Sequence, residues 1–499
     1  MEQNNSKSYL QIFKSTTIIG GASAIDIILR MIRTKVLAVL VGPSGIGLIG
    51  IYWSIMSTAS TVAGCGLSVS GVRQIAEAQS TSDRRIIAST RFALIGPSVI
   101  LAILGALSLF LFRHQISLRT FGNYEHTTEI AILSVGVFVT IVGWAQGAVL
   151  NGLRRIGDLA RINIISALAG TVVAILVALI FRESGLVYFI AATALITFLT
   201  TWYYLGKIKQ IGGPFLPGEI SAQIRILLRL GLVFMLTGFM SSGTQYLVRV
   251  LINQELGLEF IGYFHAAWSI SILYVGFILD AMGKDYYPRL TGLAKNHTDM
   301  NQLVNQQIEV ALLLSGPVIL AMLTFTPFVT GLLYAPSFST ANPILRWQII
   351  GTLFKVVSWP MGFAIVAKGR GAIFLLTEFA WHFFYVGGIW WGIKYFGLLS
   401  TGISFFTAYF IYVVIVYFTV FNLTGFILGL QNTIMTIILA LHLFLVLILS
   451  DIAPLSSYII GFLLTVVFTM YSVRSMHQIV GKPKIVEIVS NLKIKLSHR

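Results

Sequence analysis

The sequence has little charge, few acidic residues and almost no cysteine. Only 10% of its 499 residues are Asp, Glu, Lys or Arg, whereas soluble proteins carry about a quarter. The single cysteine, Cys65, excludes a disulfide framework within the chain and a cysteine-based metal site. We find no phosphate-binding glycine loop of the ATPase type, no clustered metal ligands and no nucleophile–base pair with meaningful spacing. We therefore expect no ATPase, no other enzyme, no metal and no cofactor.

Apolar residues are abundant instead. They make up 56% of the chain, and the mean hydropathy is +0.86. About twenty apolar residues cross a bilayer as a helix, so we predict an all-α polytopic membrane protein with fourteen spans and short linkers. The polar N-terminus does not resemble a cleaved signal, and we expect the first helix to be retained. The expected spans are 12–41, 46–72, 92–112, 129–152, 162–181, 185–205, 230–254, 260–283, 304–333, 344–367, 371–393, 400–424, 431–450 and 455–473.

Lysine and arginine are distributed unevenly between the predicted loops. With the N-terminus inside, the two tails and the even-numbered loops hold 24 basic residues, and the odd-numbered loops hold 5. Cytoplasmic loops are enriched in Lys and Arg, so both termini are predicted to be cytoplasmic. The net charge of +16 is then mostly this topological bias. We do not interpret it as a nucleic-acid binding surface.

Five basic residues remain inside the predicted spans. A charge near the bilayer centre costs about 2.5–3.5 kcal/mol on insertion scales, so these side chains should line a watery interior or pair with other helices. In the first helix, Asp26, Arg30 and Arg33 lie at i, i+4 and i+7 and share one face. The five cations are Arg30, Arg33, Lys35, Arg249 and Lys355.

The sequence also contains an internal repeat. Residues 41–55 align without gaps on residues 256–270 at an offset of 215, matching glycine, tryptophan, serine and isoleucine positions. Six spans separate the copies, so both have the same orientation in the membrane. We predict a parallel pseudo-two-fold repeat of two six-helix lobes around a central cationic cleft, with two extra C-terminal helices. The predicted parts are an N-lobe at 1–210, a cytoplasmic linker at 211–229, a C-lobe at 230–426, two helices at 427–476 and a basic cytoplasmic tail at 477–499.

Each intramembrane charge can also be explained by a structural role that involves no substrate. The offset places Gln245 and Arg249 of the seventh span opposite Arg30 and Thr34 of the first. Arg30 either faces the cleft or forms a local ion pair with Asp26, four residues earlier. Lys35 is close enough to the outer turn for its long stem to snorkel outward.

The same alternatives apply to the tenth and eleventh spans. Lys355 either meets a substrate and is released from Glu378 during a cycle, or pairs permanently with Glu378 to hold two helices together. His382 lies one turn beyond Glu378 and is either a satisfied buried histidine or a proton carrier. Asp280 and Lys284 form an i, i+4 pair that we expect to be solvated.

Four stretches resemble a known family. KVLAVLVGPSGIGLIGIYWSI (35–55), PRLTGLAKN (288–296), LRWQIIGTLFKVVSWPMGFAIVAKGR (345–370) and LTEFAW (376–381) are similar to Wzx-type O-antigen flippases of the multidrug/oligosaccharidyl-lipid/polysaccharide (MOP) exporter superfamily. The resemblance implies a Gram-negative inner-membrane protein that moves undecaprenyl-pyrophosphate-linked O-antigen units from the cytoplasmic to the periplasmic leaflet by alternating access. It also implies a monomer whose partners are the lipid-linked oligosaccharide, the bilayer, the O-antigen polymerase and the chain-length regulator.

The intramembrane residues suit that task. A pyrophosphate carries about two negative charges, which cannot cross a low-dielectric slab uncompensated, and Arg forks and Lys point charges bind phosphate oxygens. We assign substrate binding to the five cations, and cavity or coupling roles to Asp26, Gln245, Glu378 and His382. The alternatives are a cation-coupled multidrug (MATE-type) antiporter, which needs an acidic cavity, and a lipid II flippase of the MurJ type. A polymerase or ligase would need a long outward loop, which the sequence lacks.

Overall fold

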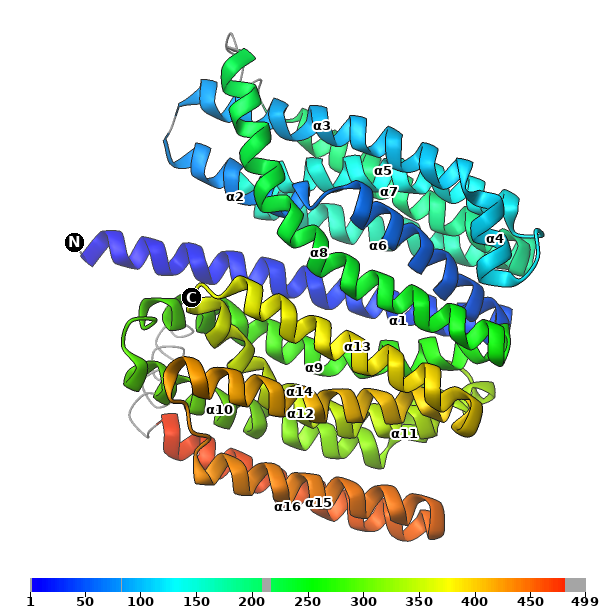
Figure 1. Ribbon diagram of the computed structural model, residues 1–499, viewed down its shortest axis with the longest axis vertical. Helices are drawn as coiled ribbons and strands as arrows, with labels where there is room; N and C mark the ends of the chain where they lie inside the picture. Colours follow the sequence, from blue (N-terminus) through cyan, green and yellow to red (C-terminus); the bar gives the residue numbers. More distant parts are fainter. Residues whose placement is uncertain (1, 82, 209–216, 481–499) are drawn as a thin grey trace, which may run out of the picture. The chain divides into compact units, whose positions relative to one another are not determined.

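All regular structure in the described part of the chain is helical, which confirms the predicted fold class. The computed structural model describes residues 2–81, 83–208 and 217–480 (Figure 1). Parts of the predicted linker at 211–229 and tail at 477–499 fall outside these residues. The elements are α1 (Glu2–Ala63), α2 (Leu67–Ser80), α3 (Arg84–Leu111), α4 (Arg113–Phe121), α5 (Thr127–Gly152), α6 (Ile156–Phe181), the 3-10 helix η1 (Arg182–Gly185), α7 (Leu186–Gly206), α8 (Pro217–Glu255), α9 (Leu258–Gly292), α10 (His297–Thr324), α11 (Thr326–Leu333), the 3-10 helix η2 (Pro336–Phe338), α12 (Ala341–Ala367), α13 (Gly371–Phe396), α14 (Leu399–Thr424), α15 (Leu430–Ile452) and α16 (Pro454–Val480).

Twelve segments within the described residues are long and apolar enough to cross a membrane. Two of them, Ile25–Ala63 with 39 residues and Ile156–Gly206 with 51 residues, are about twice the length that one crossing needs. Each contains a break, because Gly42 leaves helical geometry with φ 62° and η1 separates α6 from α7. These breaks lie where the sequence predicts loops, but the count of fourteen spans stays a prediction.

Two local expectations differ from the structure. The predicted span 46–72 is not one helix, because α1 ends at Ala63 and the backbone turns through positive φ at Cys65 and Gly66 before α2 begins. A Cβ on Gly66 would overlap a backbone carbonyl of α8, so this break accommodates a close helix crossing. The predicted loop at 113–128 contains a helix, α4, which local hydropathy did not indicate.

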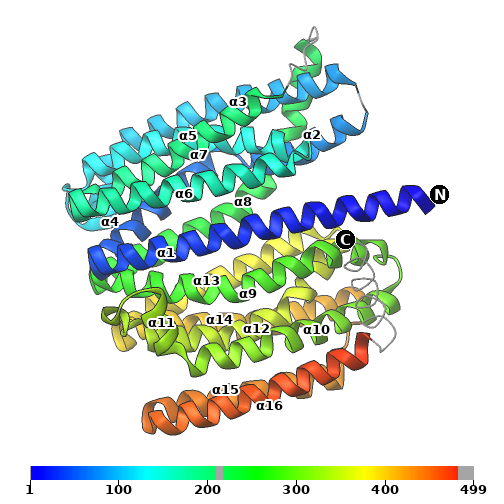
Figure 2. The same ribbon diagram turned by 180° about the vertical axis from the view of Figure 1, so that it is seen from behind.

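The chain forms two compact units. Unit 1 comprises Met1–His265 with Leu332–Phe338, and unit 2 comprises Ala266–Gly331 with Ser339–Arg499. In unit 1, α1 packs against α6 and α8, and α3, α5 and α7 lie side by side (Figures 1 and 2). The predicted lobe boundaries remain predictions.

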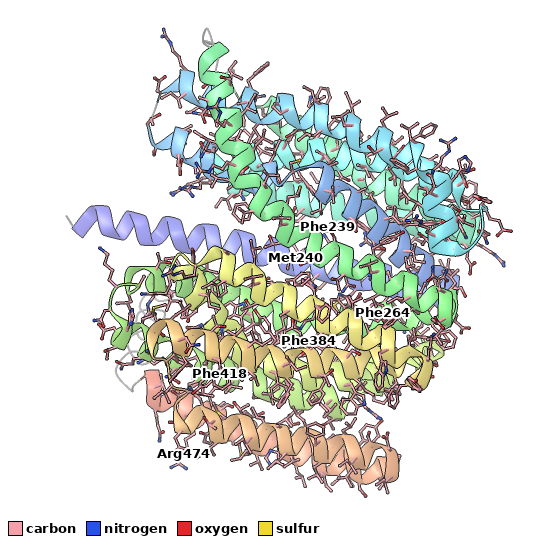
Figure 3. All side chains as sticks on the ribbon, in the orientation of Figure 1. Phe239, Met240, Phe264, Phe384, Phe418 and Arg474 are labelled. Carbon is pink, nitrogen blue, oxygen red and sulfur yellow. The ribbon has the colours of Figure 1, made fainter. Side chains whose placement is uncertain are left out.

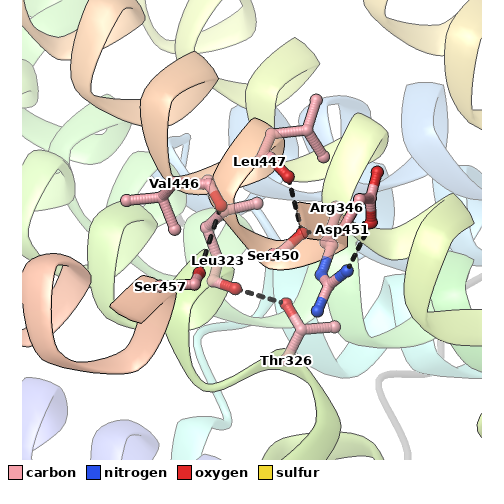
Figure 4. Close-up of polar contacts among 8 residues, drawn as sticks. All are labelled: Leu323, Thr326, Arg346, Val446, Leu447, Ser450, Asp451 and Ser457. Carbon is pink, nitrogen blue, oxygen red and sulfur yellow. Dashed lines mark hydrogen bonds and ion pairs between the residues drawn. The ribbon is translucent and has the colours of Figure 1, made fainter. Parts of the chain in front are cut away.

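In unit 2, α12 is the most buried of the twelve apolar segments and packs against α10 and α14. The last two helices attach to this core through polar contacts. Asn305 of α10 accepts a hydrogen bond from the Gly429 backbone at 2.8 Å and donates to the Ile427 carbonyl at 3.0 Å. At the other end, Arg346 of α12 forms an ion pair with Asp451 of α15 at 3.4 Å (Figure 4).

Three threonines of α7 form local hydrogen bonds that suit an apolar environment. Thr193, Thr197 and Thr201 are spaced by one turn, and each hydroxyl donates to the carbonyl four residues earlier in α7, so these polar groups need no partner in lipid. Large apolar residues such as Ile180 and Leu376 are about two-thirds exposed, at 69% and 68%. This outward apolar surface is what a bilayer would cover.

Candidate functional site

Arg30 of α1 is engaged locally. Its Nε donates to both carboxylate oxygens of Asp26 at 2.9 Å, and 63% of the Arg30 side chain is exposed. The ion pair that the sequence offered as the alternative to substrate binding is therefore present. An exposed i, i+4 pair contributes little to stability, so it leaves Arg30 able to exchange partners.

Arg33 belongs to a different environment on the same helix. Its guanidinium carbon lies 5.4 Å from the ring centroid of Phe189 in α7, a cation–π contact. A Cβ on Gly170 of α6 would lie 3.8 Å from its Nη1, so the missing side chain leaves room for the guanidinium. Lys35 is half-buried. The shared face that the spacing predicts for Asp26, Arg30 and Arg33 thus contains one ion pair and one arginine directed toward α6 and α7.

Arg249 of α8 has the most complete set of contacts among the predicted cations. Only 5% of it is exposed, and its Nη1 donates to the backbone carbonyl and the side-chain Oε1 of Gln245, both at 2.8 Å. Its Nη2 lies 3.4 Å from Nδ1 of His265, and its guanidinium carbon lies 5.5 Å from the ring of Phe264, labelled in Figure 3. Arginine has no acceptor, so the guanidinium donates in this contact and Nδ1 of His265 accepts.

Glycine makes room for this arrangement. A Cβ on Gly50 of α1 would lie 3.2 Å from Arg249 Nε and 3.3 Å from His265 Nδ1, closer than most real Cβ contacts. Gly50 therefore lets α1 approach the buried guanidinium directly. By the sequence offset of 215, Gly50 is also the repeat counterpart of His265. We call Gln245, Arg249, Phe264, His265 and Gly50 the Arg249 seat, and it lies where the two stretches of the predicted repeat approach each other.

Those copies also contact each other reciprocally. A Cβ on Gly47 would overlap the carbonyl oxygen of Leu258, and a Cβ on Gly262 would overlap the carbonyl oxygen of Pro43. Gly47 and Gly262 are counterparts in the repeat, and so are Pro43 and Leu258. This symmetry is what a local two-fold relation between the copies would produce, and we call these four residues the glycine seam.

In unit 2, Glu378 of α13 accepts a hydrogen bond from the Tyr412 hydroxyl of α14 at 2.5 Å. Lys355 of α12 lies over Tyr409 of α14, with Nζ 6.0 Å from the ring centroid. Within the described residues, Lys355 and Glu378 form no direct ion pair. The carboxylate instead has a phenol partner, and the ammonium has an aromatic face.

His382 of α13 completes this region. Its ring lies against Trp381, with ring centroids 4.8 Å apart. The expected pair of Asp280 with Lys284 involves the Lys284 side chain, which lies outside the described residues.

Sequence reasoning missed His265 and Tyr412. His265 carried a signal, because the repeat alignment places it opposite a glycine. Tyr412 carried none, since tyrosine in an apolar span is normally an interface or core residue. Among the described residues, no group of three or more His, Cys, Asp or Glu side chains could hold a metal ion.

Comparisons with known proteins agree with this architecture. The polysaccharide biosynthesis protein family matches residues 36–343. The chain is 20% identical over 417 residues to the lipid III flippase of Escherichia coli K12, covering 81% of this chain and 96% of the relative. It is 23% identical over 373 residues to a Shigella flexneri protein provisionally named as an O-antigen transporter, covering 73% and 86%.

Solved structures show the same fold. An inward-facing MATE multidrug transporter of the MOP superfamily superimposes with a TM-score of 0.66 at 16% identity, covering 82% of this chain and 96% of that chain. The lipid II flippase MurJ, in an inward closed conformation, also gives 0.66 at 12% identity, covering 92% and 99%. With its family match spanning more than half of the sequence, this chain belongs to the polysaccharide biosynthesis protein family and has the fold of the MOP exporter superfamily.

Proposed function

We propose that the protein is a flippase that moves an undecaprenyl-pyrophosphate-linked oligosaccharide, the O-antigen unit, from the cytoplasmic to the periplasmic leaflet of the inner membrane. The proposal makes it a transporter rather than an enzyme. The family match and the two relatives, named as a lipid III flippase and an O-antigen transporter, support this reaction class. The observation that carries the proposal is Arg249, a guanidinium that is 5% exposed within an apolar span.

A buried guanidinium is costly to insert, and Gln245, His265 and Phe264 lie around this one. Gln245 orients the guanidinium through two hydrogen bonds. An arriving pyrophosphate would bring negative charge to the guanidinium, whose fork matches two phosphate oxygens. Gln245 then acts as the positioning residue that holds the fork between successive substrates.

The other cations are assigned supporting roles. Arg30 exchanges Asp26 for the headgroup, and Arg33 and Lys35 add positive potential along α1. Lys355 contacts the headgroup while Tyr412 retains Glu378. We further propose that the lipid-linked oligosaccharide, the bilayer, the polymerase and the chain-length regulator are the partners of a monomer with both termini in the cytoplasm.

The competing function is cation-coupled drug export, because the fold is shared with a MATE multidrug transporter. Such a protein would use carboxylates to bind cationic substrates. In this chain Asp26 is paired with Arg30 and Glu378 with Tyr412, and Arg249 is buried within a span. These contacts favour an anionic headgroup over a cationic drug.

Deletion of the gene distinguishes the two functions. The flippase proposal expects lipid-linked units to accumulate on the cytoplasmic leaflet and long-chain O-antigen to disappear from the surface. Both are restored by the wild-type gene on a plasmid. Unchanged surface polysaccharide together with increased sensitivity to cationic dyes would replace this proposal with the antiporter.

A further inference from the structure

The segment Arg113–His126, which we call the outer strap, lies in a loop that the predicted topology places on the periplasmic side. It is bound to α8 by three hydrogen bonds. The Thr120 hydroxyl and the Tyr246 hydroxyl are 2.7 Å apart, Asn253 donates to the Thr120 carbonyl at 2.9 Å, and Gln254 donates to the Arg119 carbonyl at 2.9 Å. Two of these bonds use backbone carbonyls of α4, so they depend on the position of the strap rather than on its side chains.

The strap holds the helix that carries Arg249. Tyr246, Arg249 and Asn253 lie at i, i+3 and i+7 of α8 and so share one helical face. The strap contacts α8 one turn before and one turn after the guanidinium. Any release of the strap therefore frees the part of α8 in which Arg249 is seated.

The other end of the strap holds a histidine against α1. The hydroxyl of Tyr52 lies 3.0 Å from Nδ1 of His126, and the His126 ring lies on Phe121 of α4 with centroids 3.8 Å apart. Tyr52 is 2% exposed. A buried hydroxyl requires an acceptor, and Nδ1 is the acceptor that the structure provides.

A carboxylate next to this pair lacks a donor. Glu129, in the first turn of α5, has a buried Oε2 with no hydrogen-bond partner among the described residues. His126 is the N-cap residue of α5 and Glu129 follows it by three positions, so the carboxylate and the imidazole lie within one helical turn of each other. The titratable and charged groups around the imidazole are therefore Tyr52 from α1, Glu125 from the turn and Glu129 from α5, with Arg119 and Tyr246 at the α4–α8 face.

We infer that Tyr52, His126 and Glu129 form a proton-binding site that controls the outer strap. A proton added at Nδ1 of His126 removes the acceptor of the Tyr52 hydroxyl. The resulting imidazolium has two N–H donors, and the unpartnered Oε2 of Glu129 is the acceptor for one of them. When His126 is neutral, its hydrogen bond with Tyr52 attaches the strap to α1. When His126 is protonated, that bond is lost and the imidazolium donates to Glu129 of α5 instead.

The direction of the pH effect follows from burial. Burial lowers the pKa of His126 below its ordinary value of 6.5, and Glu129 and Glu125 oppose that shift. In a released strap the imidazole is more hydrated and its pKa returns toward the ordinary value. The released state therefore binds more protons, and a fall in pH through this range favours release.

A nitroxide on the strap measures this directly. We replace Cys65, the single cysteine, with alanine and label Gln115→Cys, an exposed position on α4. In the purified protein without substrate, label mobility is expected to rise as pH falls from 7.5 to 5, with a midpoint below 6.5. His126→Gln should remove this step, and Glu129→Gln, which takes away the charge that stabilises the imidazolium, should shift the midpoint to lower pH.

His114→Gln is the matched control, because His114 is an exposed histidine of the same strap whose ring centroid lies 6.2 Å from that of Tyr124. It should retain the wild-type step. The inference is overturned if the wild-type label shows no step, if His126→Gln keeps it, or if Glu129→Gln leaves the midpoint unchanged. The measurement uses no substrate, so its failure is distinct from a failure of the proposed flippase function.

Discussion

Arg249 carries the largest share of the proposed chemistry at the scale of single residues. Its Nη1 makes two hydrogen bonds to Gln245, and Gly50 leaves room for its Nε. The sequence identified Arg249 because it is one of the basic residues that lie inside a predicted span rather than in a loop or tail. It did not show which groups hold the guanidinium, because those groups come from α1 and α9 as well as α8.

Arg249→Ala should lower export of the lipid-linked unit by about tenfold to a hundredfold. The headgroup would lose a charge-assisted contact of about 1.5–3 kcal/mol. Arg249→Lys should restore part of the export, because it keeps the charge but loses the fork. Export is measured as long-chain surface polysaccharide, normalised to the amount of protein in the membrane. Arg474→Ala, which removes an exposed cation of α16, is the control; if it lowers export as much as Arg249→Ala does, the assignment of Arg249 to substrate is wrong.

Lys355 and Glu378 require a double variant. Lys355→Ala alone should reduce export under either interpretation. If Lys355 contacts the substrate, a double variant with Lys355→Ala and Glu378→Gln should export no better than Lys355→Ala alone. We expect this result because Tyr412 is the hydrogen-bond partner of Glu378. Recovery of export in the double variant would show that Lys355 only neutralises Glu378.

At the scale of elements, the glycine seam determines how closely α1 and α9 approach. A Cβ on Gly262 would overlap the Pro43 carbonyl, so Gly262→Ala should destabilise the protein by about 1–3 kcal/mol, as overpacking does. Gly276→Ala in the same helix has space for the methyl group, whose nearest neighbour is 4.0 Å away. There the alanine should be neutral or stabilising by about 1 kcal/mol, since it raises helix propensity.

Thermal unfolding of the two purified variants in detergent checks this. A lower Tm for Gly262→Ala, with an unchanged or higher Tm for Gly276→Ala, is the expected pair of results. Equal Tm values for both variants would mean that the seam does not constrain the helices.

The helices were predictable and their contacts were not. Long apolar runs fix where helices cross a membrane, because backbone groups in lipid must be satisfied internally. The turns at Gly42 and around 182–185 followed from glycine and charge in the sequence. Strap helix α4 did not, because it is short and polar and takes its position from bonds to α8. Nor did the break at Cys65 and Gly66, which depends on a helix more than 160 residues away in the chain.

At the scale of the whole molecule, the fold class and the family follow from the sequence with little structural help. Composition predicts a membrane protein, and four short stretches carry the family resemblance. The site is harder to predict, since hydropathy reports only that a charge lies in a span. Partners of the charge, such as His265 for Arg249 and Tyr412 for Glu378, come from other helices and are placed by tertiary packing.

The central claim is that this protein moves a lipid-linked pyrophosphate across a bilayer. Reconstitution into liposomes that contain a fluorescently labelled undecaprenyl-pyrophosphate oligosaccharide, followed by a membrane-impermeant quencher, tests it directly. We predict that the wild-type protein exposes the label of both leaflets to the quencher, and that Arg249→Ala does so about tenfold to a hundredfold more slowly. Quenching of the outer leaflet alone with the wild-type protein, as in protein-free liposomes, would contradict the claim.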